Sequence, residues 1–368
     1  MPTVSLTLIA KNEEKHIKQC FDSIYPFVDK IILVDTGSTD NTIEIAKTYD
    51  KCEVHSFKWK DDFSKARNYA LSFVDTDYWM WLDLDDIIKK EDLDKLLALK
   101  PTLNKYDIVS LVYNYGFTNQ DYMNGNPTLA FRRNRIFKTS LRLRWIDPIH
   151  EFVETLSYPA LELDAAVTHT RTHSNGTRNL DIFRSMIKNN KKMTPRNKYY
   201  YAKELYYNGL YSEALPELLG VIERKENWFE EILQAAIAVC EIYKFKRNYK
   251  KVRETCFNTF NFVSIPRAEF TYRIADSYFI ENDIKSAIYW YEIAANTEIP
   301  KNAGYINEEY YNFLPNLQLA VCYYKIGNIE KSIEHNDLAA KVNPNHSSVI
   351  YNKKFFDKMV ANKKMQNH

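Results

Sequence analysis

The stretch Tyr78-Trp79-Met80-Trp81-Leu82-Asp83-Leu84-Asp85-Asp86 decides the fold of this chain. Five large apolar residues are followed at once by three carboxylates within four positions. An apolar run of this kind is typical of a strand that is buried on both faces of a parallel sheet. Carboxylates that follow such a strand lie at the carboxyl edge of the sheet, where open α/β folds bind ligands. Because like charges this close repel each other, we expect a cation to hold them, and a divalent metal that bridges to phosphates is the natural candidate.

Strand and helix patterns alternate through the first hundred residues. We expect strands at residues 4–10, 30–34, 52–57 and 78–82. We expect helices between them at residues 13–24, 39–48 and 63–74. This alternation predicts right-handed βαβ crossovers and a parallel sheet. Further strand patterns predict a mixed, more antiparallel extension at residues 108–113, 129–137, 141–145 and 161–169.

The second half of the chain reads as all-helical from about Asn179 and carries a weak internal repeat. Each copy has an aromatic helix end, a Gly or Asn turn and, in the clearer copies, a small residue early in the next helix. The copies begin at Tyr207, Phe245, Phe279 and Tyr324. Their spacing of roughly 35 to 45 residues matches helix-pair repeats of the tetratricopeptide type. We therefore predict an α/β domain over residues 1–175 and a helical-repeat domain over residues 176–368.

The composition narrows the class of protein. The formal net charge is +2, from 50 basic and 48 acidic residues among 368, which argues against a dedicated nucleic-acid binder. Five cysteines without a CxxC spacing predict reduced thiols rather than a disulfide framework or a zinc site. The sequence shows neither a signal peptide nor a stretch of membrane-spanning length, so we expect a cytoplasmic protein.

Four polar segments follow the predicted strands, at residues 9–14, 35–42, 61–68 and 83–86. All strand ends of a parallel sheet point the same way, so these segments share one edge. Each segment alone could be only a turn, a helix cap or a solvated helix face. Together, in this order on alternating elements, they indicate one ligand site.

These residues resemble the family 2 glycosyltransferases, which have the GT-A nucleotide-sugar fold. Residues 35–42 (DTGSTDNT) are similar to the V-D-D-G-S-T-D-x-T signature, residues 83–85 (DLD) match the DxD motif, and residues 66–68 (ARN) match the A-R-N helix. The resemblance covers about residues 2–170. Within the family, the order of residues 58–68, a later His-Glu pair and the helical-repeat tail resemble the sublancin S-glycosyltransferase group, whose members glycosylate bacteriocin peptides.

The resemblance implies a role for each matching residue. The residues that it places around the nucleotide sugar are Ile9, Ala10, Glu13, Asp35, Ser38, Arg67, Asp83 and Leu84. Asp85 would ligate a divalent metal, Mg²⁺ or Mn²⁺, which offsets the charge that builds up on the leaving diphosphate. Some GT-A enzymes use a histidine of the later region as a further metal ligand. His169 is the candidate for that role, and His173 competes with it.

An inverting transfer also needs a base beside the acceptor nucleophile. Glu151 is the first candidate, His150 is its neighbour, and Asp86 is the alternative. The family often has Glu-Asp where this chain has His-Glu, so the base is left open, and the pair could also be only a capped loop. Trp145 and Asp147 are expected to shape the acceptor pocket.

We therefore predict an inverting, metal-dependent glycosyltransferase that moves a sugar from a UDP-sugar to a Ser, Thr or Cys of a peptide or protein. The repeats would recruit the acceptor or form a homodimer. The alternative enzyme builds cell-surface polysaccharide or lipid-linked oligosaccharide, but no strong basic amphipathic segment for a membrane is evident. The alternative outside enzymes is a degenerate GT-A domain in a repeat-based interaction protein, against which the intact Asp83, Asp85 and Arg67 argue.

Overall fold

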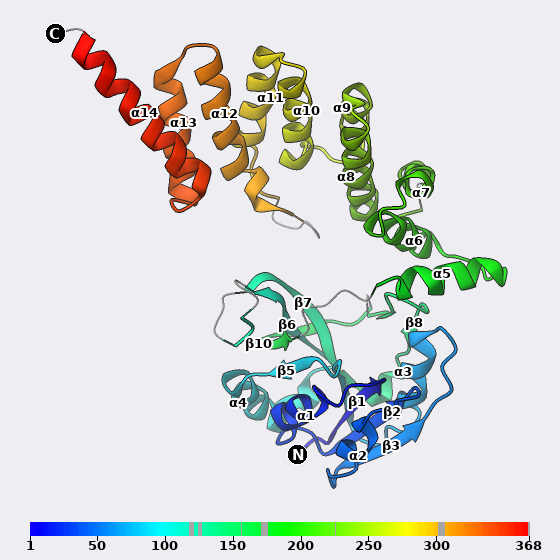
Figure 1. Ribbon diagram of the computed structural model, residues 1–368. Coiled ribbons are helices and arrows are strands. Elements are labelled where there is room, and N and C mark those ends of the chain that lie inside the picture. The colour runs from blue at the N-terminus through cyan, green and yellow to red at the C-terminus, as the bar shows by residue number, and fades with distance from the viewer. Residues whose placement is uncertain are drawn as a thin grey trace. The chain divides into compact units, whose positions relative to one another are not determined.

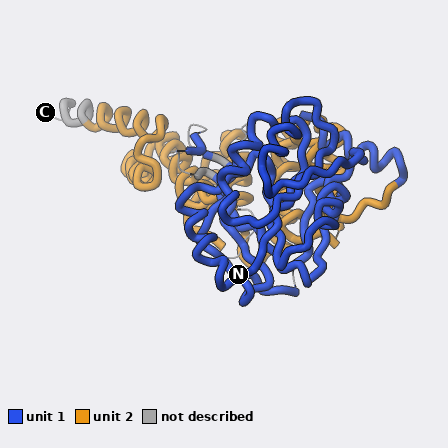
Figure 2. The backbone as a smooth tube through the Cα atoms, turned by 90° about the horizontal axis from the view of Figure 1, so that it is seen from below, with its two compact units in different colours: residues 1–190 blue, residues 191–368 orange. Residues whose placement is uncertain are grey.

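The computed structural model divides into two units, residues 1–190 and 191–368 (Figure 2). It describes residues 1–117, 121–123, 127–155, 157–170, 176–224, 226–300 and 306–366. Helix α5 (Arg178–Lys188) falls in the first unit. The domain boundary predicted after residue 175 stays a prediction.

The first unit is built on one sheet of eight strands (Figure 1). These strands are β1 (Val4–Ala10), β2 (Lys30–Asp35), β3 (Cys52–Ser56), β4 (Tyr78–Trp81), β5 (Asp86–Ile88), β6 (Ile108–Phe117), β7 (Pro127–Lys138) and β10 (Ala160–His169). Their order is β3-β2-β1-β4-β7-β6-β10-β5. The half formed by β3, β2, β1 and β4 is parallel, and β7 runs antiparallel to both β4 and β6. This arrangement confirms the predicted mixed, mostly parallel sheet.

One predicted strand, at residues 141–145, is wrong. A 3₁₀ turn occupies Thr139–Leu141, and the short strand β8 (Trp145–Ile146) pairs only with β9 (Phe152–Val153). Arg142 has a φ of 53°, in the left-handed region that an extended strand cannot contain.

Helices cover both faces of the sheet. They are α1 (Ile17–Ile24), α2 (Thr42–Ala46), α3 (Phe63–Leu71) and α4 (Lys90–Leu99). Strand β4 shows the two layers best, because successive side chains point to opposite faces. Tyr78 and Met80 join the apolar cluster that includes α1 and α4, whereas Trp79 and Trp81 join a second cluster with Trp145. Burying each such side chain contributes about 1.5–3 kcal/mol, so β4 is held in the centre of the fold from both sides.

The second unit is helical throughout its described secondary structure (Figure 1). Its α-helices are α6 (Pro195–Tyr207), α7 (Tyr211–Glu223), α8 (Phe229–Phe245), α9 (Tyr249–Thr259), α10 (Ala268–Ile280), α11 (Ile284–Asn296), α12 (Phe313–Lys325), α13 (Ile329–Val342) and α14 (Ser347–Gln366). Neighbouring helices in sequence contact each other along the whole series. No helix among the described residues is long and apolar enough to cross a membrane.

The predicted repeat is present at four helix turns of this unit. Each turn has one left-handed residue, and these are Gly209 (φ 72°), Arg247 (φ 53°), Asn282 (φ 64°) and Gly327 (φ 82°). In each turn the amide after the left-handed residue bonds to a carbonyl five residues earlier, as Asn328 does to Tyr323 at 2.9 Å. The small residues that follow three of these turns, Ala214, Ala287 and Ser332, are fully buried and let the paired helices approach closely.

Candidate active site

Arg67 of α3 joins two parts of the chain that are far apart in sequence. Its Nε donates to Glu151 Oε1 at 2.7 Å, and its Nη2 donates to Asp83 Oδ1 at 2.7 Å. The guanidinium lies against the rings of Trp81 and Trp145, with its carbon 5.1 and 4.8 Å from their centroids. Burial lowers the pKa of Arg67, but the two carboxylates outweigh it and raise the pKa, so the side chain stays charged. The DxD motif and the His-Glu pair are therefore held together by one buried cation.

The other residues of the A-R-N motif hold the same junction. Asn68 bonds the backbone of Trp145 twice, since its Nδ2 donates to the carbonyl and its Oδ1 accepts from the amide, both at 2.9 Å. Ala66 is fully buried. The amide of Phe63, at the start of α3, donates to the carbonyl of Pro148 at 2.8 Å. Helix α3 thus positions the segment that leads to Glu151.

That segment has an unusual backbone. Asp147 and His150 have φ values of 71° and 55°, in a region that non-glycine residues seldom occupy. Each such residue costs on the order of 1–3 kcal/mol, and it persists where the surroundings hold it. The result is that His150 and Glu151 both line one cavity, with the His150 ring also near Phe183 of α5.

The acidic cluster after β4 is divided between different partners. Asp83 bonds Arg67, whereas Asp86 is fully buried and bonds Arg135 Nη1 at 3.2 Å and the hydroxyl of Tyr113 at 3.1 Å. Burial raises the pKa of Asp83, but Arg67 and, more weakly, Arg135 outweigh it and lower the pKa. The sequence predicts a cation beside these carboxylates, and for Asp83 and Asp86 that cation is an arginine.

The third carboxylate, Asp85, lies beside His169. Strand β10 pairs with β5 so that His169 stands opposite Asp86, and His169 Nδ1 is 3.7 Å from Asp85 Oδ1 and 3.2 Å from Asp86 Oδ1. Burial lowers the pKa of His169, but Asp86 and Asp85 outweigh it and raise the pKa. One candidate ligand atom from each of these three residues lies within 4.8 Å of the others. Carboxylates with an imidazole are metal ligands, so the donor set fits a divalent cation. His173 lies outside the described residues.

A cavity of about 630 Å³ lies at this edge of the sheet. It is lined by most of the predicted site residues, which are Ile9, Ala10, Glu13, Arg67, Asp83, Leu84, Asp85, Trp145, His150, Glu151 and His169. Four predicted residues, Asp35, Ser38, Asp86 and Asp147, do not line it. Carboxylates, an imidazole, a buried guanidinium and aromatic rings therefore surround one space large enough for a small ligand.

Comparison with known proteins identifies the domain that contains this cavity. Residues 5–157 match the model of the family described as glycosyl transferase family 2. The chain carries a family 2 glycosyltransferase domain. Its DxD motif, A-R-N helix and His-Glu pair all lie within the matched residues.

Curated relatives match part of this sequence. The SPbeta prophage-derived glycosyltransferase SunS of Bacillus subtilis is 24% identical over an alignment of 268 positions, which covers 67% of this chain and 60% of SunS. The chain thus spans about 60% of the length of that relative. A TPR repeat-containing protein of Synechococcus elongatus is 29% identical over 154 residues, 42% of this chain and 36% of that protein. Among solved structures, S. aureus TarS 1-349 in complex with UDP-GlcNAc is similar with a TM-score of 0.38 and 14% identity, covering 94% of this chain and 93% of that chain.

Asp35 and Ser38 belong to the loop at residues 35–42, which carries the DTGSTDNT motif of the family 2 domain, and they make hydrogen bonds that hold this loop. Asp35 accepts from the amides of Gly37 and Ser38 at 3.0 and 3.1 Å, and the Ser38 hydroxyl accepts from the amide of Asn12 at 2.9 Å. Gly37 has a φ of 110°, which side chains rarely adopt. The two side chains therefore shape the turn beside the cavity, and their contact with a nucleotide stays a prediction.

Several residues that line the cavity of the family 2 domain were given no individual role by the sequence. They are Lys11, Thr36, Trp59, Phe63, Tyr113, Tyr115, Leu129, Phe131, Arg133, Ile149, Arg178 and Asn179. Strand β7 contained a usable signal, because Phe131 and Arg133 are two positions apart and so share a face of the strand. Arg178 and Asn179, which line the cavity from α5, showed no comparable pattern in the sequence.

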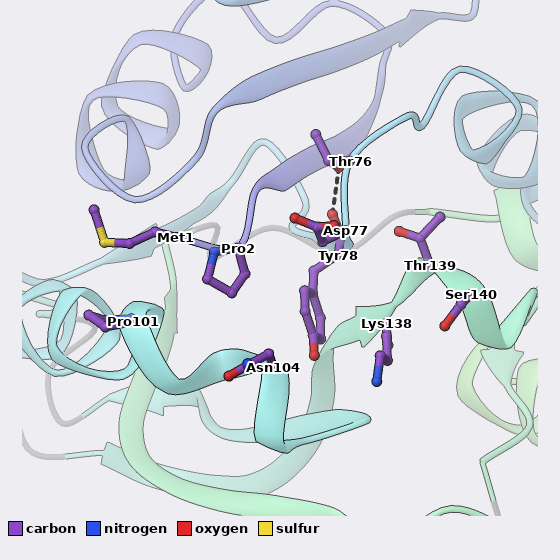
Figure 3. A pocket seen from close by; sticks show the side chains of 10 residues that line it. All are labelled: Met1, Pro2, Thr76, Asp77, Tyr78, Pro101, Asn104, Lys138, Thr139 and Ser140. Atoms are coloured by element: carbon purple, nitrogen blue, oxygen red, sulfur yellow. Dashed lines mark hydrogen bonds between the residues drawn. The ribbon is translucent and has the colours of Figure 1, made fainter.

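A second hollow, of about 750 Å³, lies at the opposite end of β4 (Figure 3). Its charged side chains are engaged locally, since Asp77 accepts from Thr3 Oγ1 at 2.9 Å and Lys138 lies 3.6 Å from Asp107. Thr76 bonds the carbonyl of Tyr78 there at 2.7 Å. Size alone does not mark the functional site of the family 2 domain, because this larger hollow has none of its chemistry.

Proposed function

We propose that this glycosyltransferase is metal-dependent and inverting, and that it moves a sugar from a UDP-sugar to a hydroxyl or thiol of a peptide or protein. The observation that carries the proposal is the pair of bonds from Arg67 to Asp83 and Glu151. Through these bonds the donor-binding motif and the candidate base line the same cavity as Asp85 and His169.

The donor would lie along Ile9, Ala10, Glu13 and Leu84, which line one part of the cavity wall. Asp85 and His169 would hold the metal, which when bound offsets charge on the leaving diphosphate. Asp86 is too buried to reach an acceptor, and we assign it a positioning role instead. Its carboxylate bonds Arg135 and the His169 ring, so it orients that ring for ligation.

Glu151 would act as the base. Arg67 holds its Oε1, and among the described residues none donates to its Oε2. That second oxygen would take the proton of the acceptor hydroxyl or thiol as the nucleophile attacks the anomeric carbon. The bond between that carbon and the diphosphate oxygen breaks, and UDP leaves from the opposite face, which inverts the anomeric centre. His150 lines the same cavity and is the second candidate.

A peptide or protein acceptor is favoured by the second unit. Stacked helix pairs of this kind form extended surfaces that suit chains better than single sugars. The resemblance to the sublancin-type group points the same way. Dimerisation through the repeats is the other role that we propose for this unit. A polysaccharide or lipid-linked acceptor remains the alternative substrate class.

The test is donor hydrolysis and transfer with purified protein. We expect UDP release from a UDP-sugar in the presence of Mg²⁺ or Mn²⁺, loss of release with a chelator, and a mass increase of one sugar on a peptide that contains Ser, Thr or Cys. Transfer to a lipid-linked or free oligosaccharide, with none to peptides, would replace the acceptor class. No release from UDP-sugars, but release from another nucleotide sugar, would refute the uridine donor.

A further inference from the structure

Two arginines of β7 lie on the same aromatic surface of the cavity. Arg133 is 5.4 Å from the ring centroid of Trp81 and 5.5 Å from that of Tyr113. Arg135 is 3.8 and 4.6 Å from the same two centroids. Between them the register of β7 against β6 shifts, because Ser110 pairs with Asn134 and Val109 with Ile136, which leaves Arg135 as the extra residue of a bulge. Bulges next to active sites re-aim side chains in this way.

The two arginines differ in their partners. Arg135 is fully buried and is matched by the equally buried Asp86 at 3.2 Å. Arg133 is only partly buried and lines the cavity. Among the described residues, no carboxylate lies within ion-pair distance of Arg133, and no hydrogen bond is made by its guanidinium. One positive charge of the pair is thus neutralised within the fold, and the other faces the cavity next to it.

An arginine held on aromatic rings beside a cavity is suited to a phosphate or carboxylate ligand. Its planar guanidinium offers several fixed N–H donors, and the rings orient it without using those donors. Arg133 and Arg135 repel each other, since burial lowers the pKa of Arg135 and the charge of Arg133 lowers it further, and an anion at Arg133 would relieve the repulsion. Arg133 also lies near enough to Asp83 to act on it, since it is one of the charges that lower the pKa of that carboxyl after burial has raised it.

We propose that Arg133 binds the diphosphate of the nucleotide sugar and stabilises UDP as it leaves, in addition to the metal that Asp85 and His169 would hold. The inference rests on the proposed function, which supplies the diphosphate. A charge-assisted bond that strengthens as the leaving group gains charge assists the transfer itself.

The chain offers a matched control in the neighbouring residue. Arg132 is on the other side of β7, where its Nε lies 3.2 Å from Glu162 Oε2 and its Nη1 donates to the carbonyl of Leu163 at 3.1 Å. Arg133→Gln and Arg132→Gln remove the same charge from adjacent positions, and only the first position lines the cavity.

The experiment is calorimetric titration of UDP and of uridine into the full chain, with Mn²⁺ present. For Arg133→Gln we expect UDP affinity to fall about 10- to 100-fold, because a bond to a charged group is lost, while uridine affinity stays within about twofold. Arg132→Gln should bind both as the wild type does, and Arg133→Lys should recover part of the UDP affinity. Circular dichroism checks that each variant is folded.

Three results would overturn the inference and leave the proposed function standing. The first is unchanged UDP affinity in Arg133→Gln, the second is an equal loss for UDP and uridine, and the third is a loss confined to the KM of the acceptor. A wild-type protein that binds neither UDP nor a UDP-sugar refutes the uridine donor of the proposed function instead. The affinities of wild type and Arg133→Gln are then compared for the nucleoside diphosphate that the protein does bind and for the matching nucleoside.

Discussion

Buried arginine–carboxylate pairs occur in both units, and their surroundings differ. In the first unit Arg67 bonds Asp83 and Glu151 at the wall of a cavity of about 630 Å³. In the second unit Arg267, which precedes α10, bonds the fully buried Glu230 in the first turn of α8, with its Nη1 donating at 3.0 Å. Among the described residues of the second unit, no cluster of three potential metal ligands accompanies such a pair.

The difference lies in what each pair holds in place. The first pair lies at a sheet edge and holds two sequence-distant carboxylates whose residues line a cavity. The second pair joins α8 to the start of α10 within the repeats. Both arrangements lose several kcal/mol if one partner is removed, because the other charge is left buried. Only the first should also lose chemistry.

Removing the proposed metal ligand should have the largest effect. We expect Asp85→Ala to lower the transfer rate about 1000-fold or more, because charge on the leaving diphosphate is no longer offset. Single-turnover transfer with saturating UDP-sugar and Mn²⁺ measures this. Asp94→Ala is the control, since Asp94 is exposed on α4 and its carboxylate lies 3.0 Å from Lys90 of the same helix. A rate within tenfold of wild type for Asp85→Ala would place the metal elsewhere.

Replacing the candidate base should slow chemistry without weakening donor binding. Glu151→Gln keeps an oxygen for the bond from Arg67 Nε. We therefore expect kcat to fall about 100- to 10,000-fold while UDP affinity stays within about twofold. Wild-type turnover in this variant would shift the role to His150, and His150→Asn in the same assay would then show the loss.

In the second unit the matching change should affect stability alone. We expect Arg267→Ala to lower the free energy of unfolding by about 3–5 kcal/mol, because the buried Glu230 loses its arginine partner. Urea unfolding measures the loss, and UDP titration into the folded variant should match wild type. Lys251→Ala, which removes an exposed pair with Glu254, should leave the unfolding curve in place. Weakened UDP binding in folded Arg267→Ala would contradict the prediction that this pair in the second unit affects stability alone.

The smallest effects concern the repeat turns. Gly327→Ala should destabilise by about 1–2 kcal/mol, because the φ of 82° is unfavourable for a residue with a Cβ atom. Gly220→Ala, inside α7, should instead stabilise by about 0.5–1 kcal/mol, since its added Cβ meets only the flexible end of Arg224. Thermal unfolding of both variants gives the sign of each change. Equal shifts in one direction would mean that the turn conformation does not limit the repeat.

Local patterns accounted for much of this architecture. The apolar run before Asp83 is a strand buried on both faces, because aromatic side chains at alternate positions had to be covered from two sides. The four repeat turns were legible because the left-handed conformation favours Gly and Asn, and only Arg247 departs from that rule. The strand expected at residues 141–145 failed because nothing in its composition marks the left-handed Arg142.

The residues that form the site were harder to predict from the sequence than the place of the site in the fold. His169 stands opposite Asp86 through the register of β10 against β5, and register depends on packing across the sheet rather than on local spacing. Asn68 reaches Trp145 over 77 positions, and Arg67 reaches Glu151 over 84. Phe131 and Arg133 shared a visible strand face, but their cavity becomes evident only when β7 lies between β4 and β6.

The sequence by itself determined that a buried strand ends in carboxylates at a ligand-binding edge, and that helix pairs follow, because burial, strand alternation and turn conformation are local properties. Only the tertiary structure decided how those carboxylates divide. Asp83 and Asp86 are each neutralised by an arginine from a distant element, and Asp85 is placed beside His169. The physical reason is that a buried charge must be paired, and its partner is set by which strands and helices come together.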